Sequence, residues 1–382
     1  MSDRRAVLAA LLSLIALPAL AAGDGPDDRS KVEPVTLPFA IKAMRGPDSD
    51  VALAVATSGL LPVARAPVSA DPKATASTAP LPVVVVWGEG GGAVLSLDGD
   101  RLRTTLIGAE AIEGFAAAET PRGAVPGSRR ALDGPLSAYL TGPTRALGGA
   151  PGQGAVLTLR ERQPLGVTAE PKAVPVTTQT LAPGGDRVFA GRTPRITRLD
   201  GRPAVVAVTA QGTAGSGLAL AAKGKDGAWT LAAQTPPQAG KDSDGAPLAL
   251  AGIADFTGEG RPQVAAIRAP DGAGVLQLWR FADGAFSLAG EGLGYAGPAA
   301  GEGADLAAAV PRAGTPPDLA LPVAGRGALA VVSLKSGTPE ERARIPLPAP
   351  AAYGIAVLEA GGAARTILVG LADGRLVAVP AP

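Results

Sequence analysis

The chain has 382 residues, of which 35 are Lys or Arg and 34 are Asp or Glu, and it contains neither His nor Cys. Without His the chain lacks the commonest general base and transition-metal ligand, which excludes Ser-His-Asp and Cys-His catalysis and His-ligated zinc, iron or copper sites. The near-zero net charge provides no field that would attract a polyanion, so nucleic acid is excluded as an expected partner.

The first element along the chain is an export signal. An arginine pair, Arg4-Arg5, precedes an apolar run from Ala6 to Leu17, and small residues end the segment at Ala22. This pattern predicts a cleaved signal peptide over residues 1–22 and a single mature domain over residues 23–382. The apolar run is shorter than the roughly 20 residues that span a bilayer, so no transmembrane anchor is expected after cleavage. We therefore predict a periplasmic or secreted protein, and the arginine pair leaves general secretory and twin-arginine export open.

The mature chain is a succession of short apolar runs separated by turns. It holds 52 Gly and 37 Pro, and no segment sustains a helical period except weakly near Ala116 and Ala307. This pattern predicts an all-β fold. Seven of the runs align as comparable second strands of a repeated unit. They are Val51 to Ala56, Val83 to Trp87, Ser137 to Thr141, Pro203 to Val208, Gln263 to Ile267, Pro317 to Leu321 and Thr366 to Val369.

Several runs are followed by a second pair of strands with an Asp-Gly turn between them. The four turns are Asp98-Gly99, Asp226-Gly227, Asp283-Gly284 and Asp373-Gly374. Asp-Gly between apolar stretches predicts a hairpin closed by a type I′ turn, which needs a positive φ at both central residues. The recurrence indicates that one hairpin is rebuilt along the chain.

The most informative segment runs from Ile253 to Ile267, where an Asp-x-x-Gly-x-Gly turn leads directly into an apolar strand. It resembles the FG-GAP or VCBS repeat, the blade unit of integrin-alpha-type seven-bladed β-propellers, whose usual motif is Asp-x-(Asn/Asp)-Gly-Asp-Gly-x-x-Asp. The resemblance implies a calcium-type loop with side-chain oxygens from Asp255, Thr257, Glu259 and Gln263. A hard cation takes many oxygen ligands, and the glycines let the backbone curl around it.

Only Asp255 and Glu259 keep a negative charge among these four positions, and fewer charged ligands weaken calcium binding. The alternative is that Asp255 and the glycines only shape the turn between two strands. No cofactor is therefore expected, with weak calcium binding as the other possibility. Other copies are poorer, such as Thr197 to Pro203, which lacks the front half of the loop.

Together with this resemblance, the seven runs predict a seven-bladed β-propeller of four-stranded antiparallel blades. The last run, Arg375 to Val379, looks like the third strand of a blade, and the chain stops soon after it. Val32 to Leu37 at the mature start is a candidate for the missing fourth strand. Pairing of the two ends would close the ring and leave no exposed sheet edge at that joint.

Other conspicuous side chains are interpreted as structural. The basic knot Arg122, Arg129 and Arg130 is expected to be a solvated loop, as are the acidic runs Asp24 to Asp28, Glu110 to Glu119 and Glu340-Glu341. Trp87, Trp229 and Trp279 are expected to pack between blades, because a buried indole contributes a large apolar area.

No catalytic motif emerges, so we expect a non-enzyme: a binding or scaffold module for a protein or peptide in the cell envelope. A carbohydrate-binding propeller is the first alternative. The second is a hydrolase or lyase that uses Asp or Glu, since carboxylates alone support glycoside chemistry. Fold alone does not choose among these functions.

Overall fold

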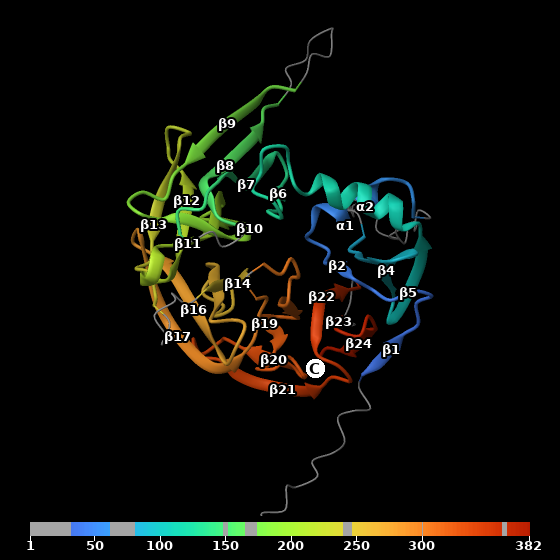
Figure 1. The fold of residues 1–382 in the computed structure, drawn as a ribbon. Coiled ribbons are helices and arrows are strands. Elements are labelled where there is room, and N and C mark those ends of the chain that lie inside the picture. The colour runs from blue at the N-terminus through green and yellow to red at the C-terminus, as the bar shows by residue number, and fades with distance from the viewer. Residues whose placement is uncertain are drawn as a thin grey trace, which may run out of the picture.

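The computed structural model describes residues 32–61, 81–147, 152–164, 174–239, 247–299, 301–360 and 365–382. These residues form antiparallel sheets arranged around a common centre (Figure 1), which is the architecture of a β-propeller. The predicted signal peptide and the run Asp24 to Asp28 lie outside the described residues. Within the described ranges no helix is long and apolar enough to cross a membrane.

Four sheets have four strands each. The first contains β2 (Ala43–Arg45), β3 (Val84–Gly88), β4 (Gly91–Asp98) and β5 (Arg101–Ile107). The next two contain β14 (Leu248–Ala254), β15 (Gln263–Arg268), β16 (Gly274–Ala282) and β17 (Ala285–Tyr295), and β18 (Ala308–Arg312), β19 (Thr315–Pro322), β20 (Ala328–Ser333) and β21 (Glu340–Pro346). The last contains β22 (Ala351–Glu359), β23 (Arg365–Leu371), β24 (Leu376–Pro380) and β1 (Glu33–Val35).

The remaining strands form one eight-stranded sheet. Its two halves are β6 (Ala131–Asp133), β7 (Leu136–Pro143), β8 (Gly154–Arg162) and β9 (Val176–Leu181), and β10 (Val188–Leu199), β11 (Arg202–Ala210), β12 (Ser216–Lys223) and β13 (Trp229–Gln234). Within the described residues the halves are joined by the pair Phe189 and Gly154 of β10 and β8. The sheet thus consists of two four-stranded units whose strands pair with each other only at these two residues within the described structure.

The described residues therefore supply six four-stranded units, where the sequence predicted seven. The prediction was wrong at Val51 to Ala56, which lies in helix α1 (Asp50–Thr57). Ser49 caps this helix, because its side chain accepts a hydrogen bond from the Ala52 backbone N–H at 3.1 Å. Val51, Ala52 and Val55 are buried, a spacing that places them on one face of a helix.

Helix α1 packs against α2 (Ala109–Ala118), and both lie between the β2–β5 sheet and β6 (Figure 1). The weak helical pattern near Ala116 is confirmed by α2, while Ala307 precedes strand β18. An apolar cluster joins the helices to the first sheet through Val51, Val85 and Ile112.

Elsewhere apolar clusters bridge neighbouring units directly. Trp279 packs with Leu218 and Val264 between the β10–β13 and β14–β17 units, and Trp229 lies in the cluster shared by β6–β9 and β10–β13. The exposed fractions of Trp87, Trp229 and Trp279 are 8%, 5% and 7%, which confirms that they belong to the core.

The two ends of the described chain pair in one sheet. Strand β1 is antiparallel to β24, with Glu33 opposite Ala378 and Val35 opposite Leu376. The predicted pairing of the N-terminal segment with the last strand is thus confirmed. It leaves β24 hydrogen-bonded on both sides, by β1 and by β23.

The Asp-Gly turns lie between consecutive strands, as predicted, but only one of the four has the predicted geometry. Asp283 and Gly284 both have positive φ, at 52° and 77°. In the other three turns the Gly alone has a positive φ. A further turn with both angles positive is Asp200-Gly201, at 49° and 76°, within the segment interpreted as a degraded calcium loop. That segment is a tight hairpin between β10 and β11.

Candidate functional site

One cavity of the described structure has a volume of about 310 Å³ and lies between the β10–β13 and β14–β17 units. It extends toward the segment before β18 and the loop before β6. Its walls are mostly apolar and small, with Val208, Leu248, Leu250, Pro247, Pro270 and Pro298 among them. The charged side chains that line it are Arg129, Arg195, Glu302 and Asp305.

Arg195 reaches this cavity because β10 is irregular. The pairing of β10 with β11 shifts between Ala190 and Arg195. Gly191 has a φ of +75°, a conformation that other residues rarely adopt, and Pro194 has no backbone N–H to donate to a strand. A bulge of this kind bends a strand and redirects the side chain that follows it. The side chain of Arg195 is 34% exposed.

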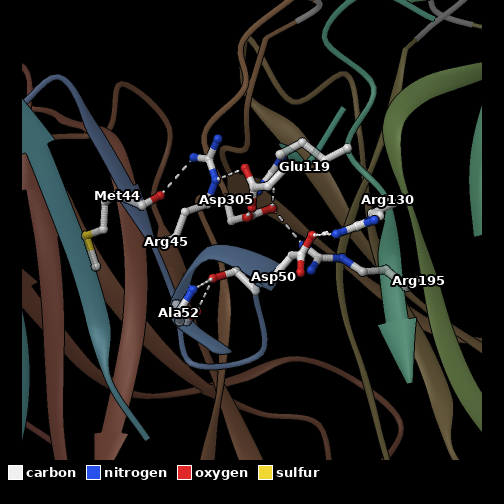
Figure 2. Close-up of polar contacts among 11 residues, drawn as sticks. Met44, Arg45, Asp50, Ala52, Glu119, Arg130, Arg195 and Asp305 are labelled. Atoms are coloured by element: carbon white, nitrogen blue, oxygen red, sulfur yellow. Dashed lines mark hydrogen bonds and ion pairs between the residues drawn. The ribbon is translucent and has the colours of Figure 1, made fainter. Parts of the chain in front are cut away.

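Asp305 lies in the segment that leads into β18, and its backbone oxygen accepts a hydrogen bond from the Ile355 N–H of β22 at 2.7 Å. Its carboxylate accepts two bonds from Arg129, at 2.9 and 3.0 Å, and one from Arg195 Nη2 at 2.7 Å. Figure 2 shows Asp305 and Arg195 in this group. We call Arg129, Arg195 and Asp305 the Arg–Asp–Arg cluster.

The cluster holds its carboxylate in the ionised form. Burial alone would raise the pKa of Asp305, but the charges of Arg129 and Arg195 outweigh it and hold this pKa well below the usual aspartate range. Burial alone would lower the pKa of Arg129, but the charge of Asp305 and its hydrogen bonds more than offset that effect, so the pKa of Arg129 is raised. Both partners therefore remain charged at neutral pH.

The basic knot was not correctly interpreted from the sequence. Arg122 is exposed, but the side chain of Arg129 is only 11% exposed and that of Arg130 is 28% exposed. Arg130 donates to Asp50 at 2.6 Å, and its backbone N–H donates to the Glu119 oxygen. The loop is anchored by ion pairs, because Arg129 meets Asp305 of the segment before β18 and Arg130 meets Asp50 of α1.

Glu119, at the end of α2, is also buried rather than solvated. It is 3% exposed and accepts a bond from Arg45 at 2.8 Å. Arg45 lies 5.3 Å from the centroid of the Trp87 ring, a cation–π distance. Burial and the nearby Arg129 lower the pKa of Arg45. Figure 2 shows the Arg45–Glu119 pair, which joins β2 to the end of α2, and the Arg130–Asp50 pair, which joins the loop before β6 to α1.

The acids that line the cavity are held by arginines. Glu302 accepts from Arg326 at 3.1 and 2.8 Å and from the Ala299 N–H at 2.9 Å. Burial alone would raise the pKa of Glu302, but these hydrogen bonds lower it by more, so the pKa of Glu302 falls below its usual value. Neither Glu302 nor Asp305 is therefore poised to carry a proton near neutrality.

The predicted calcium-type loop is closed by its own hydrogen bonds. Asp255 accepts three backbone N–H bonds, from Gly258 at 2.8 Å, Glu259 at 3.0 Å and Gly260 at 2.8 Å. Glu259 also pairs with Arg280 at 2.9 Å. The carboxylate that would hold a cation thus accepts bonds from the turn itself.

Gln263 and Thr257 complete this loop from the inside. The Gln263 amide nitrogen donates to Thr257 Oγ1 and to the Arg261 oxygen, both at 2.8 Å, and its oxygen accepts from the Thr257 N–H at 3.2 Å. The amide therefore presents N–H groups to the loop, where a calcium site would need oxygen. Among the described residues no group of three or more acidic, His or Cys side chains is placed to hold a metal ion. This geometry fits a turn better than it fits calcium.

No protein-family model and no curated protein matches the sequence. Among solved structures, Trypanosoma rangeli sialidase in complex with sialic acid is similar at a TM-score of 0.39 and 12% identity over 78% of this chain and 51% of the sialidase, about half its length. AofleA from Arthrobotrys oligospora gives 0.39 and 12% over 79% of each chain, and Aleuria aurantia lectin gives 0.35 and 13% over 77% of this chain and 85% of the lectin. At these TM-scores the likenesses carry no inference about function, and the FG-GAP or VCBS resemblance stays a prediction.

Proposed function

We propose that this protein is a non-catalytic β-propeller that binds a protein or peptide in the cell envelope, with a ligand group held in the cavity beside the Arg–Asp–Arg cluster. The observation that carries the proposal is this cavity of about 310 Å³, which has a positively charged cluster on one side and apolar walls around it. A concave, mostly apolar pocket with a few convergent polar groups is the usual form of a ligand site.

The proposal includes a closed ring of six units. Its support is the pairing of β1 with β24, which joins the first described strand to the last. A closed ring fixes the distances between loops of different units, and the cavity depends on such loops, because its residues come from the segments before β6, β14 and β18 as well as from β10. The envelope location rests on the predicted signal peptide.

Catalysis by carboxylates is the less favoured alternative. Hydrolysis of a glycoside needs one acid that is protonated and one that is free to attack or to activate water. Asp305 and Glu302 are both ion-paired with lowered pKa values. A binding role uses the same groups without requiring them to exchange protons.

Carbohydrate binding is the other alternative, and the cavity gives it less support than peptide binding. Sugar sites commonly stack the ring on an aromatic side chain, and no Trp, Tyr or Phe is among the described residues that line the cavity. The three tryptophans are buried in the cores between units and beside the helices. Apolar side chains of a peptide match the walls better.

A parallel screen tests the proposal. Residues 23–382 would be applied to a displayed peptide library and to a glycan array, with Arg195→Gln as the cavity variant and Arg198→Gln as the matched control. Arg198 lies on the same strand, is 57% exposed and pairs with Asp133. We expect peptide hits. Glycan hits without peptide hits would overturn the choice of ligand, and the absence of any hit would overturn the binding role.

A further inference from the structure

We infer that the group bound in this cavity is a single carboxylate carried by a peptide, held by Arg195 at the open side of the Arg–Asp–Arg cluster. The inference rests on the proposed binding function and specifies the chemistry of the ligand. It is drawn from the charge of the cluster, from the donors that Arg195 keeps free and from the polarity of the surrounding walls.

Among the described residues, the cluster carries one positive charge that has no internal partner. Arg129 and Arg195 share the single carboxylate of Asp305. The neighbouring ions are paired one to one, Arg45 with Glu119 and Arg130 with Asp50. A ligand with one negative charge would neutralise the cluster. A dianion such as phosphate would leave an excess negative charge in an apolar surrounding, which is costly.

Arg195 is the member that can reach a ligand. It uses Nη2 to bind Asp305, and its guanidinium makes no other hydrogen bond to the described residues. Its side chain is 34% exposed, whereas Arg129 is 11% exposed and donates two bonds to Asp305. A guanidinium offers five N–H donors in a planar fork, so Arg195 retains a donor pair that matches a carboxylate.

The walls favour an organic acid with an apolar body. Val208, Leu248 and Pro270 line the cavity, and the hydroxyls of Thr193 and Ser216 are the small polar groups nearby. Hydrogen bonds to charged groups are stronger where water is excluded. The amide of Gln153, which could serve sugar hydroxyls, is engaged with the backbone N–H and oxygen of Leu147 at 3.3 and 3.2 Å. An acidic peptide therefore fits better than an acidic sugar.

The test is calorimetric titration of residues 23–382 at neutral pH with matched pairs of neutral and acidic ligands. N-acetyl-leucine is compared with N-acetyl-leucinamide, which removes the charge at a C-terminal carboxylate. N-acetylated, C-terminally amidated Leu-Asp and Leu-Asn dipeptides make the same comparison for a side-chain carboxylate. We expect at least one acid to have a dissociation constant at least about tenfold lower than that of its amide, because a hydrogen bond to a charged group is lost in the amide.

Variants locate the site. Arg195→Gln should weaken binding of the acid by about tenfold or more, while Arg198→Gln should leave it unchanged. Arg195→Lys keeps the charge but loses the fork, and we expect an intermediate affinity. Thermal melts of each variant verify folding, and the acid and amide comparison on the unaltered protein stands even where a variant does not fold.

Glucuronate is titrated in parallel as an acidic sugar. Three outcomes would overturn the inference: equal binding of acid and amide, binding of glucuronate but of neither peptide acid, and acid binding that Arg195→Gln leaves intact. These differ from failure of the binding function itself. Peptide hits in the display screen that are insensitive to charge would support the binding function and contradict the inference that the ligand is a carboxylate. The absence of any hit would contradict both the binding function and the carboxylate inference.

Discussion

Asp255 and Asp305 each accept three hydrogen bonds, but from opposite kinds of donor. Asp255 bonds backbone N–H groups three to five residues further along the chain. Asp305 bonds two guanidinium groups that lie 176 and 110 residues away. The first aspartate shapes one turn, and the second ties together the segment before β18, the loop before β6 and strand β10.

The difference decides what each aspartate contributes. A carboxylate that accepts backbone N–H bonds at a turn resembles a cap and stabilises by about 1 kcal/mol. A carboxylate between two largely buried arginines balances charges that would otherwise be stranded in the protein, and removing it costs about 3–5 kcal/mol. The motif that is easiest to see in the sequence is thus the weaker of the two interactions.

The largest expected effect is that of Asp305→Asn. Asparagine keeps the shape but brings no charge, so Arg129 and Arg195 lose their common partner. We expect a loss of about 3 kcal/mol in the free energy of unfolding, at the lower end of the range because Arg195 is one-third exposed. Urea unfolding would measure it. Asp133→Asn is the control, because its partner Arg198 is 57% exposed, and a similar loss in both variants would contradict the assignment.

The stabilisation by Asp305 also depends on pH in one direction. Its pKa in the folded protein is depressed below the unfolded value near 4, so folding favours the ionised form. This contribution is fully present above about pH 5 and is lost as the pH falls below about 4 toward the folded pKa. The difference in unfolding free energy between the native protein and Asp305→Asn should therefore shrink below pH 4. A difference that stayed constant down to pH 3 would argue against the depressed pKa.

The same distinction between local and distant contacts explains what the sequence could predict about the fold. Six of the seven predicted runs are strands, because alternation and Gly or Pro boundaries are local signals. Val51 to Ala56 was assigned to a strand, although Ser49 and the acidic Asp50 at its start are signals of a helix beginning there. The helical spacing of Val51, Ala52 and Val55 is visible only once burial is known.

The candidate site could not be found in this way. Nothing in the sequence places Asp305 beside Arg129 or Arg195, since the three meet only when separate units pack against one another in the folded protein. The usable signal was indirect: Gly191 and Pro194 interrupt a segment that otherwise resembles a strand, and such interruptions mark bulges. The basic knot was visible, but whether Arg129 is solvated depends on an acid far along the chain.

Removal of the N-terminal strand tests the most distant contact of all. A deletion up to Leu37 exposes the edge of β24 and removes the partly buried Val35 and Leu37 from the apolar cluster that they share with Leu376 and Ala378. We expect a clear fall in the melting temperature, corresponding to about 2 kcal/mol for these two side chains. A deletion that stops at residue 31 retains β1 and serves as the control. An unchanged melt after the longer deletion would reject the proposed closure of the ring.

A smaller effect is expected for Asp255→Ala. The substitution removes the acceptor of three backbone N–H groups, but these lie on exposed residues and can bond water, so we expect a loss of about 1 kcal/mol. Asp226→Ala is a matched control, since within the described ranges the Asp226 side chain accepts only the Ala228 N–H, at 3.1 Å. Urea unfolding compares the two. A loss as large as that of Asp305→Asn would show that the Asp255 turn is more than a local feature.

The smallest expected effect is that of calcium on the Asp255 loop. A site with a dissociation constant near 1 mM would add about 1.4 kcal/mol to the unfolding free energy at 10 mM calcium. We expect no such gain, because both Asp255 oxygens accept N–H bonds and the Gln263 amide directs its own N–H groups at Thr257 and Arg261. Melts with calcium and with equal magnesium separate binding from ionic strength. A gain specific to calcium and lost in Asp255→Ala would show that the loop rearranges to present oxygens, and that its likeness to the FG-GAP or VCBS motif includes the metal.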